Sequence, residues 1–147
     1  MTERLLLDVM LGKLATYLRM CGYDAAYALD REIENDDAVR AVANQEERLL
    51  VTRDADLAAA ADGLLLDARD PTDQLRELAA AGFDLTLPAE PERCSTCNHP
   101  LEAVGVEPTP DYAPDPAVED VWRCPDCGQH FWKGSHWDDV RSTLSEL

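Results

Sequence analysis

Lysine is nearly missing from this chain of 147 residues, and long apolar runs are missing altogether. Only Lys13 and Lys133 occur, against 30 acidic residues, and the formal net charge is −17. No segment approaches the roughly 20 apolar residues that a membrane-spanning helix needs. Residues 1–7 also lack the apolar run of a secretory signal. We therefore expect a soluble, cytoplasmic protein with no membrane partner.

The acidic excess is spread along the chain. Residues 1–90 hold 19 acidic and 9 basic residues, and residues 91–147 hold 11 and 4. This pattern suits a surface kept hydrated in concentrated salt, so we take a halophile-like surface as a hypothesis. The charge argues against binding of nucleic acid at low salt. In molar salt the objection weakens, because the Debye length falls to about 3 Å.

Cysteines are few, but four of them form two CxxC pairs. Cys94 and Cys97 make the first pair, Cys124 and Cys127 the second, and 26 residues separate the pairs. This spacing predicts a zinc ribbon with four thiolate ligands. Iron in a rubredoxin-like site is the main alternative, and two disulfides are another. The fifth cysteine, Cys21, lies among apolar residues of a predicted helix and is expected in the core.

Residues 1–86 alternate between short apolar runs and helical stripes. Strands are predicted at 4–8, 24–28, 48–52 and 63–67, and helices at 10–21, from about 36, at 54–61 and at 71–81. Such alternation predicts an α/β unit with a parallel sheet. A linker with two prolines at 84–92 separates it from a zinc-ribbon unit at 91–147, which ends in a helix from about 138 to 147.

Acidic residues follow the predicted strands. Asp8 ends the first strand, Asp54 and Asp56 follow the third, and Asp36 lies at a helix start. The carboxyl ends of parallel strands share one edge, where ligands bind. Clustered carboxylates need a cation, and oxygen ligands select Mg²⁺ or Mn²⁺. Metal-assisted phosphodiester hydrolysis is the reaction that this suggests. The alternative is that Asp36, Asp54 and Asp56 are helix caps.

Taken in order, several segments resemble the Mut7-C RNase family, a PIN-like nuclease domain followed by a zinc ribbon. The matching segments are LLLDVMLGKLATYLRMCGYD at 5–24, RLLVTRDADL at 48–57, FWKGSHW at 131–137 and the two CxxC pairs. The resemblance implies a PIN-like α/β fold, Mg²⁺- or Mn²⁺-dependent cleavage of RNA, and acidic site positions at Asp8, Asp36, Asp54 and Asp56. It also allows a homodimer.

Three basic residues are candidates for contact with RNA phosphates, and each has an alternative as an ordinary surface charge. They are Lys13 and Arg53, each near an acid, and Lys133 in the ribbon. The aromatic residues Phe131, Trp132 and Trp137 could stack on bases, although packing of the ribbon onto the sheet is favoured.

A metal-dependent ribonuclease is the leading hypothesis for the function. The competing hypotheses are a noncatalytic RNA- or ribosome-associated zinc-ribbon adaptor and a regulator that acts through protein contacts.

Overall fold

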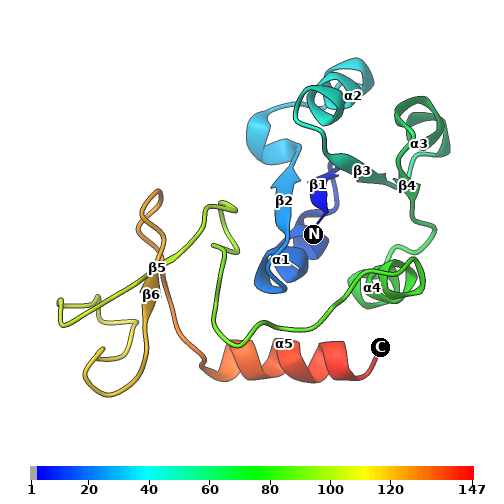
Figure 1. Ribbon diagram of the computed structural model, residues 1–147. Coiled ribbons are helices and arrows are strands. Elements are labelled where there is room, and N and C mark those ends of the chain that lie inside the picture. The colour runs from blue at the N-terminus through cyan, green and yellow to red at the C-terminus, as the bar shows by residue number, and fades with distance from the viewer. Residues whose placement is uncertain (1–2) are drawn as a thin grey trace.

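The computed structural model describes residues 3–147, so the first two residues of the predicted 1–86 unit lie outside the described part. Figure 1 shows a larger α/β unit, a smaller β unit beside it, and a final helix that runs back under the first. The elements of the larger unit are β1 (Arg4–Leu7), α1 (Gly12–Met20), β2 (Asp24–Tyr27), the 3-10 helix η1 (Leu29–Arg31), α2 (Asp36–Gln45), β3 (Leu49–Thr52), α3 (Ala55–Ala61), β4 (Leu64–Leu65) and α4 (Pro71–Ala80). Those of the remainder are β5 (Glu102–Ala103), β6 (Trp122–Arg123), β7 (His130–Phe131) and α5 (Ser135–Ser145).

The first four strands form a parallel sheet in the order β2-β1-β3-β4, and the last three form an antiparallel sheet in the order β5-β6-β7. The predicted fold class, a parallel sheet flanked by helices and followed by a small four-cysteine ribbon, is confirmed. Among residues 3–147 no helix combines the length and apolar character needed to cross a membrane.

Helices cover both faces of the parallel sheet. Leu5 and Leu7 of β1 point into one cluster, to which α1, α4 and α5 contribute, and Leu6 points into a second cluster with α2 and α3. All three leucines are fully buried. Successive side chains of a strand point to opposite faces, so a strand covered on both faces requires a continuous apolar run.

Local signals explain where most helices start. Asn35 caps α2, Asp54 caps α3 and Asp70 caps α4, each accepting backbone N–H bonds from the first turn. Helix α1 begins later than the predicted residue 10 because Met10 has φ of 76°, a left-handed conformation that no helix continues through.

Strand β4 is shorter than the predicted 63–67 strand. Its two residues pair with β3, and the amide of Leu66 still donates to the carbonyl of Thr52 at 2.8 Å. The chain then turns away, because the Glu77 carboxylate of α4 accepts the amides of Asp67 and Ala68. The Glu77 side chain, and not a neighbouring strand, is therefore the hydrogen-bond acceptor for these two amides.

The last helix begins at Ser135, three residues before the predicted start. Trp137, Val140 and Leu144 of α5 lie in the same buried cluster as α1 and α4. This helix follows the ribbon in sequence, yet it packs on the parallel sheet (Figure 1). Its contacts therefore tie the end of the chain to the larger unit.

The first cysteine loop, residues 94–98, covers the free edge of β2. Asn98 Oδ1 accepts the amide of Ala25 at 2.9 Å, and the Nε of Arg19 donates to the Ala25 carbonyl at 2.8 Å. The Nη1 of Arg19 also donates to the carbonyls of Ser95 and Thr96, both at 3.1 Å. The outward backbone groups of Ala25 are thus satisfied by side chains instead of by another strand.

A second link at this edge is ionic. Asp24 accepts from Arg48 at 2.8 Å and from the Asn98 side-chain amide at 2.7 Å. Partial burial raises the pKa of Asp24, but these hydrogen bonds and the nearby arginine charges outweigh it and lower the pKa to about 2. The carboxylate of Asp24 is therefore charged in the folded protein at neutral pH.

We expect Arg19→Lys to lower the free energy of unfolding by about 1–3 kcal/mol. A lysine has one ammonium group and cannot reach carbonyls on both sides as the forked guanidinium does. Chemical denaturation measures the change. Arg76→Lys is the matched control, because Arg76 is an exposed helical arginine paired with Asp73 and its change should stay within about 0.5 kcal/mol. Equal effects of the two substitutions would contradict the role of Arg19.

Asp24 should make stability depend on pH in acid. Because the folded-state pKa lies below the unfolded value, its contribution is complete above pH about 4 and is lost as the pH falls toward about 2. Thermal unfolding of the wild type and of Asp24→Asn across this range tests it. The wild type should be more stable at neutral pH, and the difference should shrink at acid pH. A constant difference would show that the charge of Asp24 is not involved.

Candidate functional site

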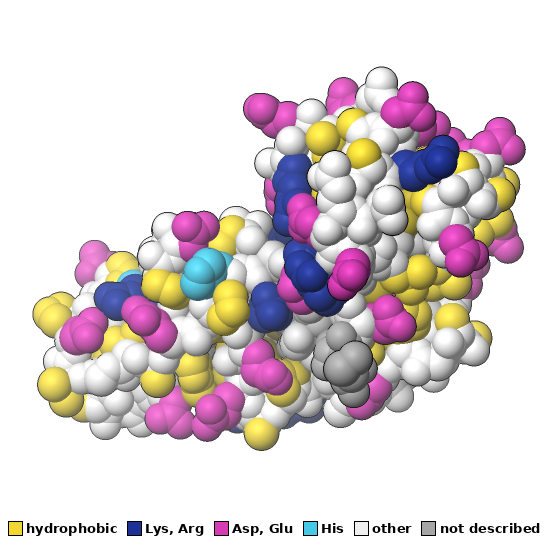
Figure 2. Space-filling model, turned by 45° about the horizontal axis from the view of Figure 1, so that its top comes forward, with side chains coloured by type: hydrophobic (Ala, Val, Ile, Leu, Met, Phe, Trp, Pro, Cys, Tyr) yellow, Lys and Arg dark blue, Asp and Glu magenta, His cyan; other side chains and the backbone are white. Residues whose placement is uncertain are grey.

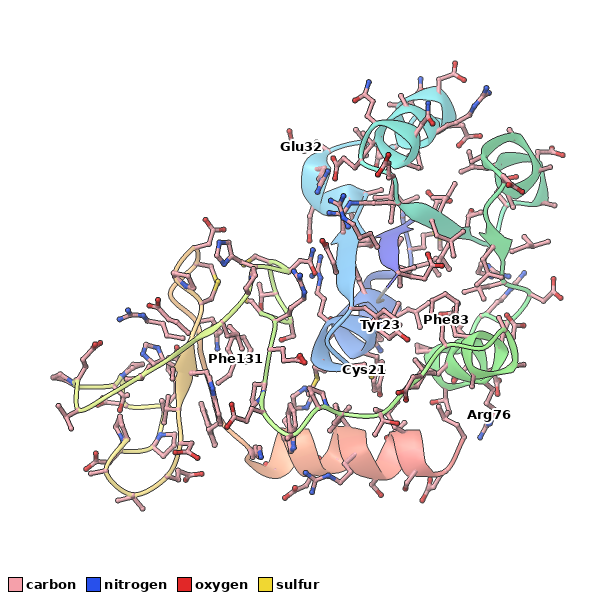
Figure 3. The ribbon with its side chains drawn as sticks, viewed as in Figure 1. Cys21, Tyr23, Glu32, Arg76, Phe83 and Phe131 are labelled. Atoms are coloured by element: carbon pink, nitrogen blue, oxygen red, sulfur yellow. The ribbon has the colours of Figure 1, made fainter. Side chains whose placement is uncertain are left out.

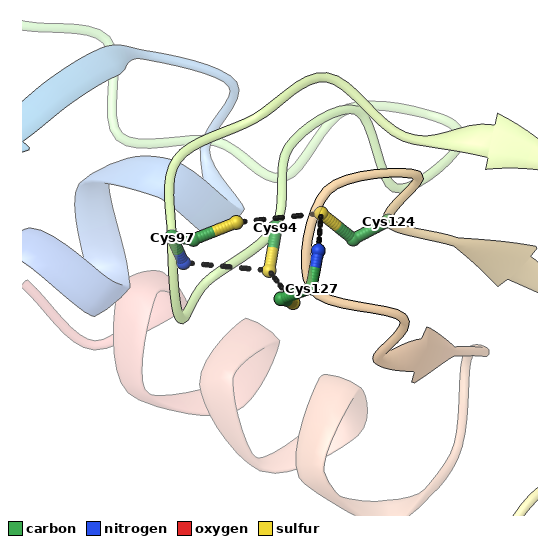
Figure 4. A group of neighbouring side chains, drawn as sticks. All are labelled: Cys94, Cys97, Cys124 and Cys127. Atoms are coloured by element: carbon green, nitrogen blue, oxygen red, sulfur yellow. Dashed lines mark hydrogen bonds between the residues drawn. The ribbon is translucent and has the colours of Figure 1, made fainter.

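The two cysteine loops have the same backbone design (Figure 4). In each, the amide of the first cysteine donates a hydrogen bond to the carbonyl five residues later. Cys94 donates to His99 and Cys124 donates to Gln129, both at 2.9 Å. In each, the second cysteine's amide donates to the first sulfur at 3.4 Å. The residue after the second cysteine has positive φ, 73° at Asn98 and 81° at Gly128. Each loop therefore turns its two sulfurs toward the same point.

The four sulfurs lie close together without being bonded. Cys94 and Cys127 are 3.6 Å apart at their Sγ atoms, and Cys97 and Cys124 are 3.3 Å apart. A disulfide would require about 2.05 Å. Tetrahedral Zn–S bonds of about 2.3 Å place sulfurs about 3.8 Å apart. All five cysteines are free, and all four Sγ atoms of the loops lie within 4.8 Å of one another. The cluster could bind zinc.

The protonation of these thiols is uneven. Burial raises the pKa of Cys97, and the neighbouring thiols of Cys124 and Cys94 raise it further. Burial also acts on Cys124, but the amide of Cys127 and the thiol of Cys97 outweigh it and lower its pKa to about 7. A sulfur that ionises near neutral pH is ready to accept a cation.

Thr52 joins the first and third strands at the carboxyl edge of the parallel sheet. Its hydroxyl donates to Asp8 Oδ2 at 2.7 Å and accepts the amide of Asp54 at 3.0 Å. The amide of Asp8 donates to the carbonyl of Val51 at 3.0 Å. Thr52 is fully buried. Its hydroxyl therefore holds the Asp8 carboxylate and the Asp54 backbone in fixed relative positions.

Successive crossovers of the chain run in opposite directions from the place between β1 and β3. From β1 the chain crosses by α1 to β2, and α1 packs on one face; it then crosses by α2 to β3, and α2 packs on the other. The carboxyl ends of β1 and β3 therefore flank the topological switch point, where open α/β sheets bind ligands. Asp8 follows β1 directly, and Asp54 follows β3 after one residue, Arg53.

The other two predicted acids begin helices. Asp36 is the first residue of α2, and Asp56 lies in the first turn of α3, where its amide donates to Asp54 Oδ1 at 2.9 Å. Within residues 3–147, the four cysteines are the only group of three or more potential metal ligands whose donor atoms all lie within 4.8 Å. The four carboxylates are oxygen donors suited to Mg²⁺ or Mn²⁺, but they are not drawn together to that distance.

The predicted basic contacts lie on the surface. Lys13, Arg53 and Lys133 are exposed, and none has an ionic partner within 4.0 Å in the described part of the chain. The Nη2 of Arg53 lies 3.5 Å from the carbonyl of Asp67. Acidic side chains spread over both units on the face shown in Figure 2.

The aromatic residues of the ribbon divide into two kinds. Trp137 is buried in the cluster under the parallel sheet, as expected for packing. Phe131 and Trp132 are only half-buried, and the Trp132 ring lies 6.2 Å from that of Tyr112.

Two residues that join the ribbon to the sheet, Arg19 and Asn98, were not predicted from the sequence. Their contacts between the two parts link positions more than 70 residues apart. No local pattern marks them.

Comparison with known proteins gives one match. The family model described as the Mut7-C RNAse domain matches residues 3–144. No curated protein and no solved structure matches the chain.

Cys94→Ser should release the metal and unfold the ribbon, because metal binding supplies much of the stability of a small cysteine module. It should also loosen the edge of β2, since Arg19 holds the carbonyls of the same loop. Metal content per chain and the denaturation midpoint measure both effects. Cys21→Ser is the matched control, because Cys21 lies outside the cluster. A ribbon that stays folded in Cys94→Ser without metal would contradict this account.

Proposed function

The chain belongs to the Mut7-C RNase domain family, and from this premise we propose that it hydrolyses phosphodiester bonds of RNA at the carboxyl edge of its parallel sheet. One observation carries the choice of site. The hydroxyl of Thr52 links the carboxylate of Asp8 to the backbone of Asp54 at the switch point. Two acids on neighbouring strands are thereby held in place before any ligand arrives.

In the proposed site Asp8 and Asp54 would hold Mg²⁺ or Mn²⁺, and Asp36 and Asp56 would complete the shell or orient water. When bound, such an ion activates water and neutralises charge that develops on the phosphate. Asp54 Oδ1 is occupied by the α3 amides of Asp56 and Leu57, which fixes the direction of its carboxylate. The buried Thr52 fixes Asp8 in the same way.

The exposed basic side chains near this edge contact the substrate in this proposal. Lys13 lies in the first turn of α1, and Arg53 directly precedes Asp54. Both are available to bind the phosphate beside the cleaved bond. We place Lys133 of the ribbon in contact with a more distant phosphate. The halophile-like surface fits this scheme, because concentrated salt leaves only such close contacts effective.

In this proposal residues 1–86 form the nuclease unit and residues 91–147 the zinc-ribbon unit. The ribbon supports the nuclease unit directly, because Asn98 of its first loop binds the edge of β2 and Arg19 of α1 binds two carbonyls of that loop. Zinc held by the four cysteines would keep that loop in shape and take no part in the reaction.

A noncatalytic RNA adaptor is the second candidate, and one observation favours it. The four proposed carboxylates do not gather as the four cysteines do. In an adaptor the acidic edge would be vestigial, and RNA binding would not depend on Asp8.

Asp8→Asn tests the ribonuclease proposal. We expect Mn²⁺-dependent cleavage of mixed single-stranded and structured RNA in high-KCl buffer to be lost. The free energy of unfolding should change by less than about 1 kcal/mol, because asparagine keeps the shape and can still accept the amide of Val9. Cleavage is measured with Mn²⁺, with Mg²⁺ and without added metal.

Asp62→Asn is the matched control. Asp62 is exposed at the end of α3 with φ of 53°, a conformation that asparagine tolerates. It should cleave like the wild type. Metal-dependent cleavage that survives Asp8→Asn would reject the site. RNA binding without any cleavage by the wild type would favour the adaptor.

A further inference from the structure

A cavity of about 330 Å³ lies where the ribbon, the end of α1 and the start of α5 meet. Its walls come from Met20, from Arg93, from Thr96 of the first cysteine loop, and from residues 129–132 and 134–137. None of the four cysteines or the four proposed catalytic aspartates lines it. It is therefore separate from both sites described above.

Two buried nitrogen atoms without partners mark this cavity. Within residues 3–147, the only enclosed side-chain nitrogen or oxygen atoms without a hydrogen-bond partner are Nδ1 of His130 and Nε1 of Trp137. Both residues line the cavity, and Trp137 is only 5% exposed. Nearly all buried polar groups in folded proteins are paired. Both atoms are enclosed by protein, so a small shift of their rings toward the cavity would be needed to give them a partner, which a ligand with hydrogen-bonding atoms can supply.

The start of α5 adds an anion-binding element to the same cavity. Gly134 is its N-cap and provides no side-chain cap, so the first-turn amides stay available. Arg93 lies beside it with Nη1 donating to the Asn98 carbonyl at 2.8 Å, and it has no ionic partner within 4.0 Å in the described chain. The first-turn acid Asp138 is exposed and faces Arg141 at 3.6 Å. Glu92, also in the wall, is exposed.

Aromatic surfaces complete the cavity. Phe131 and Trp132 line it and are half-buried, so part of each ring is open. Figure 3 shows Phe131 on the ribbon side of the molecule, far from Phe83 beside α4. Open aromatic faces bind nucleobases by stacking, whatever the base. Flat walls, unpaired ring nitrogens and an anion site together match a nucleotide.

We propose that this cavity binds one unstacked nucleotide of single-stranded RNA, with the base on Phe131 and Trp132 and the phosphate at the start of α5 beside Arg93. This inference rests on the proposed ribonuclease function for the identity of the polymer. Met20 ends α1, whereas Asp8 lies before its start, and the 9 residues of α1 span about 14 Å. The cavity therefore anchors the RNA away from the bond that is cut.

The test uses the full zinc-loaded chain carrying Asp8→Asn, so that RNA stays intact. Fluorescence anisotropy measures the Kd for labelled oligoadenylate and for an abasic ribose-phosphate oligomer of the same length. We expect the abasic oligomer to bind about tenfold more weakly. Adding Phe131→Leu should weaken oligoadenylate about tenfold and leave the abasic oligomer unchanged. Phe83→Leu is the matched control, because Phe83 is a half-buried phenylalanine outside this cavity, and it should change neither Kd.

A second measurement needs no change in the cavity. Oligoadenylate should protect tryptophan fluorescence of the Asp8→Asn chain from acrylamide quenching, since the half-buried Trp132 lines the cavity, and the abasic oligomer should not. Equal protection by both oligomers, or equal effects of Phe131→Leu and Phe83→Leu, would overturn the proposal. Cleavage by the wild type is measured separately. Cleavage without base-dependent binding rejects only the cavity, and base-dependent binding without cleavage rejects only the nuclease.

Discussion

The backbone of Ala25 is the point on which the two parts of this protein depend. Its carbonyl and amide face away from the sheet, and a side chain from α1 and one from the first cysteine loop take the place of a fifth strand. Because Arg19 also binds two carbonyls of that loop, the four-cysteine cluster and the parallel sheet share one buried guanidinium. Neither part can shift without leaving polar groups unpaired, which makes the arrangement rigid.

Rigidity at one side of the sheet matters for the acids at its carboxyl edge. Strand β1 lies between β2 and β3, so the position of Asp8 follows from pairing on both sides. The hydroxyl of Thr52 then links Asp8 to Asp54, because it bonds the carboxylate of the first and the amide of the second. The catalytic proposal thus concerns side chains fixed by strand register, and the 9-residue helix α1 separates them from the proposed nucleotide cavity.

Much of the fold could be predicted because its signals are local. A run of three leucines predicted a strand covered on both faces. Asn35 and Asp54 are residue types that favour helix starts, and the CxxC spacing predicted four converging sulfurs. The start of α5 was missed because its N-cap, Gly134, carries no capping side chain. The contacts of Asn98 were missed because its partner Asp24 is 74 positions away. The full acidic site stays a prediction, since charge and spacing alone do not fix where the four carboxylates lie relative to one another.

The irregular segment between β5 and β6 leaves the small sheet and returns to it at one place. The amide of Val104 donates to the carbonyl of Val121 at 2.9 Å, and the strands on either side pair in register. Within the segment, the Tyr112 hydroxyl also accepts the amide of His130 at 3.1 Å, whereas Val106 and Val118 are exposed. Loop-closure entropy grows only slowly with length. The exposed stretches around Val106 and Val118 are accordingly places where the chain can gain or lose residues, or carry a reporter group, while the sulfurs and the sheet stay as they are.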